Sequence, residues 1–82
     1  MKTIEYKTSG TCSSKVILTL EGTTIKTACF EGGCEGNLQG ICRLIAGMDA
    51  LEVARRLHGV DCDGRGTSCP DQLAHAIEEN LK

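Results

Sequence analysis

The chain has 82 residues, a formal net charge of −2 and six cysteines, with Tyr6 and Phe30 as its aromatic residues. This length predicts a single domain over residues 1–82. A domain so small buries only about 60% of its unfolded surface and often needs a metal or cross-links beside its core. The acidic balance, without a basic run or an aromatic stacking platform, excludes nucleic acid as the main partner and disfavours an anionic membrane surface.

Targeting signals are missing from the sequence. No apolar stretch approaches the roughly 18 residues of a transmembrane helix, and the start MKTIEYKTSG lacks the apolar segment of a signal peptide. We therefore expect a cytoplasmic protein that does not enter the membrane. In a reducing cytosol, cysteines in a small chain are more naturally metal ligands or redox thiols than a permanent disulfide frame.

The first third of the chain predicts three strands. Residues 2–7 and 14–20 are rich in β-branched and aromatic residues, and Val16, Leu18 and Leu20 alternate as one buried strand face does. Gly22 interrupts this pattern and predicts a tight turn into a third strand over residues 23–30. The expected unit is a three-stranded antiparallel sheet.

A first helix is predicted after the strands. Asn37 is the expected N-cap, because apolar residues then recur at helical spacing from Leu38 through Ile41 to Ile45. Gly47 is expected to end this helix.

Two more helices complete the predicted fold. Asp49 and Glu52 resemble a capping box that opens the second helix, and Gly59 suits its end. After a loop rich in glycine and aspartate, Thr67 or Ser68 is expected to cap a last helix that runs through residue 81. The predicted fold class is α+β, in the order βββααα.

The cysteines divide into two groups by their place among these elements. Four fall in loops or at the ends of elements: Cys12, Cys34, Cys62 and Cys69. Cys29 lies inside a strand and points opposite to Phe30, and Cys42 lies on the apolar face of a helix, so both are interpreted as fillers. A tetrahedral zinc ion or an iron–sulfur cluster takes about four thiolates, which makes the loop cysteines the candidate ligands. No CxxC pair is present, so the spacing alone leaves plain thiols as an open alternative.

Other polar residues offer weaker candidates. His58 lies four residues before Cys62 and is a candidate extra ligand, although a place near a helix C-terminus equally suits capping. His75 is expected to be exposed, and Asp61 and Asp71 are interpreted as loop, turn or capping residues. No histidine is placed in the sequence to activate a cysteine, so an independent catalytic activity is not expected.

The sequence Thr67-Ser68-Cys69-Pro70-Asp71, followed by Gln72-Leu73-Ala74, resembles the signature of the TSCPD-domain family. Residues 6–13, 30–37 and 59–62 are also similar to the small stand-alone members, so the resemblance covers nearly the whole chain. It implies four shared cysteines at Cys12, Cys34, Cys62 and Cys69. It also implies a link to cobalamin-dependent ribonucleotide reductases, some of which end in a related domain. Asp63 departs from the family pattern, in which glycine is expected.

The order of elements also resembles the U-type iron–sulfur cluster scaffold proteins. Cys12, Cys34 and Cys69 fall where that family carries cysteines, but Ser13 and Ser68 replace its usual Asp and His. This resemblance implies a shared fold and leaves cluster assembly as an alternative.

The resulting prediction is a metal-binding domain with a four-cysteine site, with zinc as the first choice and an iron–sulfur cluster as the second. Its expected partner is a ribonucleotide reductase or another redox enzyme. One alternative is a thiol/disulfide protein that donates electrons to a reductase, which the absence of CxxC weakens. Another is a non-catalytic module that binds a partner through the acidic Glu78-Glu79 of the last helix.

Overall fold

The computed structural model describes residues 1–11, 13–32, 35–61, 64 and 66–81, and the structural statements below concern these residues. The elements follow in the order β1 (Lys2–Lys7), β2 (Ser13–Glu21), β3 (Thr24–Gly32), α1 (Glu35–Ile45), α2 (Ala50–Leu57) and α3 (Cys69–Leu81). The predicted α+β class and the order βββααα are confirmed.

The strands form one antiparallel sheet in the order β1-β2-β3, as predicted. Glu21 pairs with Thr24, so β2 and β3 are joined by the tight turn expected at Gly22. Gly22 has φ +63°, a left-handed backbone conformation that most other residues adopt only with strain. The turn therefore fixes the register of the long central hairpin.

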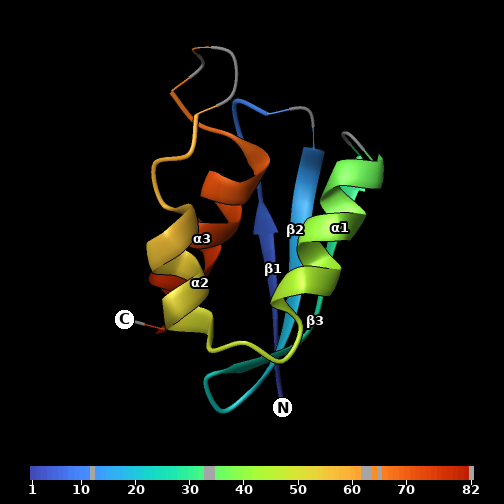
Figure 1. Ribbon diagram of the computed structural model, residues 1–82, viewed down its shortest axis with the longest axis vertical. Helices are drawn as coiled ribbons and strands as arrows, with labels where there is room; N and C mark the ends of the chain where they lie inside the picture. The colour runs from blue at the N-terminus through green and yellow to red at the C-terminus, as the bar shows by residue number, and fades with distance from the viewer. Residues whose placement is uncertain (12, 33–34, 62–63, 65, 82) are drawn as a thin grey trace.

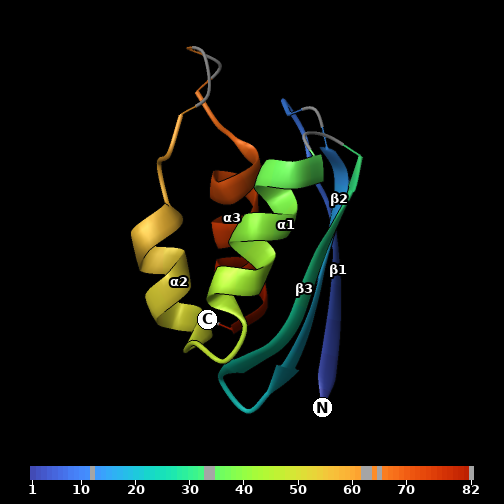
Figure 2. The ribbon, with the colours of Figure 1, turned by 45° about the vertical axis from the view of Figure 1, so that its right-hand side comes forward.

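All three helices lie on the same side of the sheet. Helix α1 packs along β3, α3 packs on β1 and β2, and α2 lies against α3 rather than on the sheet (Figures 1 and 2). The ends of β1 and β3 and the starts of β2, α1 and α3 lie at the same end of the molecule, at the top of Figure 1. This end brings together segments that lie far apart in the sequence.

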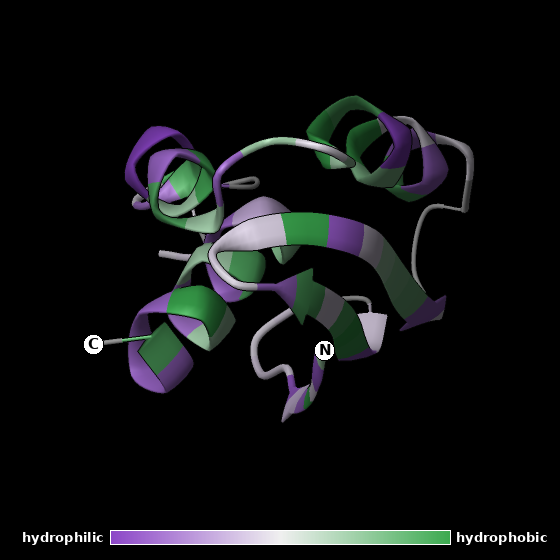
Figure 3. Cartoon of the chain, turned by 90° about the horizontal axis from the view of Figure 1, so that it is seen from below, coloured by the Kyte–Doolittle hydropathy of each residue, from purple (hydrophilic) through white to green (hydrophobic). Residues whose placement is uncertain are grey.

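The core forms between the sheet and the helices. Val16, Leu18 and Leu20 of β2 are fully buried, which confirms the alternation predicted from the sequence. They pack in one cluster with Leu73 and Ile77 of α3. Burial of each such side chain contributes about 1.5–3 kcal/mol. In Figure 3 the helices carry both green apolar and purple polar segments, as amphipathic helices on a core do.

Helix α2 begins and ends as the sequence predicts. The carboxylate of Asp49 accepts a hydrogen bond of 3.1 Å from the backbone N–H of Glu52, which makes Asp49 the N-cap. Gly59 follows the helix with φ +85°, a conformation suited to its C-terminal stop. No helix in the described part of the chain is long and apolar enough to cross a membrane.

The predicted start of α1 is wrong. Asn37 was expected as the N-cap but lies inside the helix, which already begins at residue 35. Leu38 and Ile45 are buried and lie on the face of α1 that packs against the rest of the domain. Ile45 belongs to the core cluster. Packing of an amphipathic face contributes more to a helix than a single capping preference, so the helix extends beyond the residue with the best capping side chain.

Candidate functional site

The start of α3 is built by the Thr67-Ser68-Cys69-Pro70-Asp71 sequence. Ser68 is the N-cap, because its hydroxyl accepts a hydrogen bond of 3.1 Å from the backbone N–H of Asp71. The same hydroxyl donates to the carbonyl oxygen of Val60 at 2.6 Å. Pro70 lies in the first turn, where a backbone N–H has no partner within the helix. The sequence thus produces a helix start that is capped and attached to the segment before it.

Cys69 occupies the first position of α3 and is 8% exposed. Its Sγ lies 3.1 Å from the hydroxyl oxygen of Ser13, at the start of β2. A hydroxyl that donates to sulfur stabilises the thiolate, and so does the partial positive charge at a helix N-terminus. Of the four predicted ligands, Cys69 is the one that the structure describes, and it lies at a helix N-terminus beside a hydroxyl group.

The other three predicted ligands, Cys12, Cys34 and Cys62, lie outside the described residues, as does Asp63. Their described neighbours can be placed. Ser13, which follows Cys12 in the chain, is the residue that contacts Cys69. Ser13 also pairs with Gly32, two residues before Cys34. The residue after Cys12 therefore contacts Cys69, and its partner in the sheet lies two residues before Cys34.

The segment before Cys62 approaches the same helix start. Val60 accepts the hydrogen bond from Ser68, and Asp61 accepts hydrogen bonds from the backbone N–H groups of Gly64 and Gly66 at 2.8 and 2.5 Å. The turn role predicted for Asp61 is confirmed. Segments adjacent to Cys12, Cys34 and Cys62 all lie at the end of the molecule that carries Cys69.

Asp71 has a larger role than the predicted turn or cap. Its carboxylate is buried and accepts hydrogen bonds from Thr67 Oγ1 at 2.6 Å, the backbone N–H of Gly59 at 2.6 Å and His75 Nε2 at 3.1 Å. Burial alone would raise the pKa of Asp71, but these hydrogen bonds and the nearby His75 outweigh it and lower the pKa below its ordinary value. Asp71 therefore links the start of α3 to the end of α2 as an ionised group.

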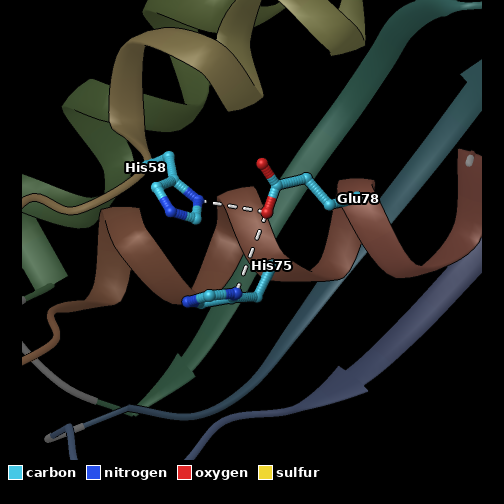
Figure 4. A group of neighbouring side chains, drawn as sticks. All are labelled: His58, His75 and Glu78. Carbon is cyan, nitrogen blue, oxygen red and sulfur yellow. Dashed lines mark hydrogen bonds and ion pairs between the residues drawn. The ribbon is translucent and has the colours of Figure 1, made fainter.

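A second cluster, which the sequence analysis missed, lies farther along α3 (Figure 4). Glu78 Oε1 lies 3.1 Å from His58 Nδ1 and 3.8 Å from His75 Nδ1. His75 is expected from the sequence to be exposed, but only 36% of its side chain is exposed. This expectation is therefore wrong in part. Asp71, His75 and Glu78 are spaced at i, i+4 and i+7, which places them on one face of a helix and could have been recognised in the sequence. The approach of His58 from α2 could not, because it depends on tertiary packing.

The remaining cysteines flank a groove of about 610 Å³ between α1 and β3, which Phe30, Leu38 and Arg43 also line. Cys42 is half-buried in it, and burial, with a smaller effect of Cys29, raises the pKa of the Cys42 thiol to about 11. Its interpretation as a packing residue agrees with these surroundings. Cys29 points away from the core, opposite to Phe30, as predicted, but it is exposed, so its interpretation as a filler is wrong.

The fold and the cysteine-bearing start of α3 define a small cysteine-rich α+β domain. The TSCPD domain family matches residues 2–81, and the chain belongs to this family. No curated protein and no solved structure matches the chain.

Proposed function

We propose that the protein is a metal-binding domain in which Cys12, Cys34, Cys62 and Cys69 hold a zinc ion, with an iron–sulfur cluster as the second choice. The observation that supports this most directly is the contact between Cys69 and Ser13. It brings the residue after Cys12 to a buried sulfur at a helix N-terminus. The segments that lead to Cys34 and Cys62 approach the same end of the molecule.

The chemistry of this end favours thiolate ligation. A helix N-terminus lowers the pKa of a nearby thiol, and a metal ligand must be deprotonated. A zinc site made of four cysteines is usually closed and structural, which suits a domain whose core is small. A reducing cytoplasm, which we propose as the location, would keep these thiols available to a metal.

The family relation supports a ribonucleotide reductase, or another redox enzyme, as the partner of this domain. In this proposal the domain has no catalytic activity of its own and acts as an accessory to the enzyme. The test is to measure the turnover of a cobalamin-dependent ribonucleotide reductase with and without the metal-loaded domain, and complex formation by size-exclusion chromatography. Unchanged turnover without a complex would exclude this partner.

Metal analysis with an absorption spectrum of protein purified without oxygen tests the metal proposal. We expect a colourless protein with one tightly held zinc ion per chain, whereas a brown protein would select the iron–sulfur cluster. Removal of the metal with a chelator should strongly lower the melting temperature, because metal-binding free energy becomes folding free energy when the unfolded chain has no site. A metal-free protein of equal stability, which forms one reversible intramolecular disulfide in air, would select the thiol/disulfide alternative.

A further inference from the structure

Two histidines and a carboxylate meet where the end of α2 lies against α3. His58 follows α2 as its C-cap, while His75 and Glu78 come from one face of α3 (Figure 4). One nitrogen from each ring and one oxygen from the carboxylate all lie within 4.8 Å of one another. We propose that His58, His75 and Glu78 form a second metal site, specific for a divalent transition metal such as Zn²⁺ and independent of the cysteines.

The two distances to Glu78 fit zinc with small adjustments. Zinc binds imidazole nitrogen and carboxylate oxygen at about 2.0–2.2 Å, so two ligand atoms of a tetrahedral site lie about 3.3 Å apart. The separations here are 3.1 Å from Glu78 Oε1 to His58 Nδ1 and 3.8 Å from Glu78 Oε1 to His75 Nδ1. A zinc ion would take the place of the proton that His58 and Glu78 share in their hydrogen bond. The ligand set of two imidazoles and one carboxylate is one that zinc adopts in proteins.

Asp71 orients one ligand before any metal binds. It accepts a hydrogen bond from His75 Nε2, and an ionised carboxylate only accepts, so Nε2 carries the proton. In the neutral form of His75 the lone pair is therefore on Nδ1, the nitrogen that faces Glu78. Histidine ligands of metals usually donate their other ring N–H to a carboxylate or carbonyl in this way.

The same carboxylate also holds the chain next to the other histidine ligand. Asp71 Oδ1 accepts from the backbone N–H of Gly59, the residue after His58. One buried carboxylate thus supports His75 through its side chain and His58 through the adjacent backbone. Because Asp71 already holds both histidines near their binding positions, metal binding needs to order these side chains less.

Three protein ligands leave a fourth position of a tetrahedral zinc ion for water or another small ligand. His58 has 55% of its side chain exposed, so solvent reaches the cluster. The proposed site therefore differs from a closed four-cysteine site, because its metal is accessible and can exchange. Bound zinc would also connect the end of α2 to α3.

The test is a calorimetric titration of Zn²⁺ into the metal-loaded full chain, with His58→Ala and Glu78→Gln as the variants and Glu79→Gln as the matched control. Both Glu variants lose one negative charge from neighbouring positions of α3, but Glu79 interacts with Tyr6 and not with the histidines. We expect wild type and Glu79→Gln to bind one Zn²⁺ beyond the thiolate-bound metal. Loss of a supporting partner alone costs about 10–100-fold in metal affinity, so loss of a direct ligand should cost about 100-fold or more.

A second measurement separates a metal site from a cluster that only stabilises the fold. Added Zn²⁺ should raise the melting temperature of wild type and Glu79→Gln but not of His58→Ala, which replaces an exposed side chain and should fold normally. Equal Zn²⁺ binding by wild type and Glu78→Gln would overturn the proposal. So would an equal loss in Glu79→Gln, because the effect would then reflect net charge alone.

Discussion

Cys69 and Cys42 each lie in a helix of this domain, but their surroundings differ. Cys69 is the first residue of α3, buried beside the hydroxyl of Ser13. Cys42 lies in the last turn of α1 and lines the groove against β3, where burial raises the pKa of its thiol to about 11. A helix N-terminus offers unpaired N–H groups and partial positive charge, whereas the last turn of a helix offers unpaired carbonyl groups and partial negative charge.

This comparison shows that the place of a cysteine within its element predicts its chemistry better than the number of cysteines does. Burial favours the neutral thiol at Cys42, whereas the sulfur of Cys69 lies at a helix N-terminus beside a hydroxyl group. Substitutions of Cys69 and of Cys42 should therefore differ in both the size and the kind of their effects.

The largest effect is expected for Cys69→Ser. The variant keeps nearly the same side-chain volume, so a large loss would report the missing ligand rather than a cavity. If the thiolates hold structural zinc, the free energy of unfolding should fall by about 5 kcal/mol or more, since such sites provide about 10–16 kcal/mol in zinc-finger peptides. Thermal unfolding with and without a chelator measures this. A variant that melts with wild type, and a wild type insensitive to chelator, would contradict a structural metal.

Asp71→Asn should have the next largest effect. The amide keeps the shape of the side chain but cannot accept all the hydrogen bonds from Thr67, Gly59 and His75. Hydrogen bonds to a charged group contribute about 1.5–3 kcal/mol, so we expect a loss of about 2–3 kcal/mol in urea unfolding. The matched control is Glu21→Gln, which also replaces a carboxylate by an amide but at an exposed surface position, and it should cost less than about 1 kcal/mol. Equal losses of unfolding free energy in the two variants would show that the buried hydrogen bonds of Asp71 contribute no more to stability than an exposed carboxylate does.

Acid should reduce the difference in unfolding free energy between wild type and Asp71→Asn. The pKa of Asp71 is lowered in the folded protein from the ordinary value of 3.8. Its ionised form therefore stabilises the fold above that pH, and this contribution is lost as the pH falls through the lower folded value. The gap in unfolding free energy between metal-free wild type and Asp71→Asn should stay constant from about pH 7 to 5 and narrow below about pH 4. A gap that widens in acid would mean that the pKa shift has the opposite sign.

Cys42→Ala is expected to have the smallest effect. The change removes a half-buried sulfur from the groove between α1 and β3, and the free energy of unfolding should fall by about 1 kcal/mol. Chelator should lower the melting temperature of this variant as much as that of wild type. Loss of the chelator response would show that Cys42 takes part in the metal site.

Much of the fold could be predicted because local patterns and tertiary packing agree. The alternation in β2, the turn at Gly22 and the cap at Asp49 each depend on short-range geometry that the sequence displays. The start of α1 could not be predicted, because docking of its apolar face overrode the capping preference of Asn37. The exposure of Cys29 depends on which face of the sheet the helices cover, and the sequence does not show that the face opposite Phe30 stays uncovered.

Some features of the candidate site could be predicted from the sequence, and others could not. The position of Cys69 followed from the sequence, since a Ser-Cys-Pro run before a helical pattern predicts a helix start. The contact with Ser13 could not be predicted, because it joins residues 56 positions apart. The cluster of His58, His75 and Glu78 required the packing of α2 on α3, although the i, i+3 pair on α3 was visible.

Native mass spectrometry of wild type, Cys69→Ser and Cys42→Ala, all purified without oxygen, tests the central claim most directly. Each protein should also carry Glu78→Gln, so that metal on the histidine cluster is not counted. The account predicts one metal ion or cluster per chain in the wild-type and Cys42→Ala backgrounds and none in Cys69→Ser. Full metal in Cys69→Ser together with its loss in Cys42→Ala would contradict the assignment of the thiolate site to the start of α3.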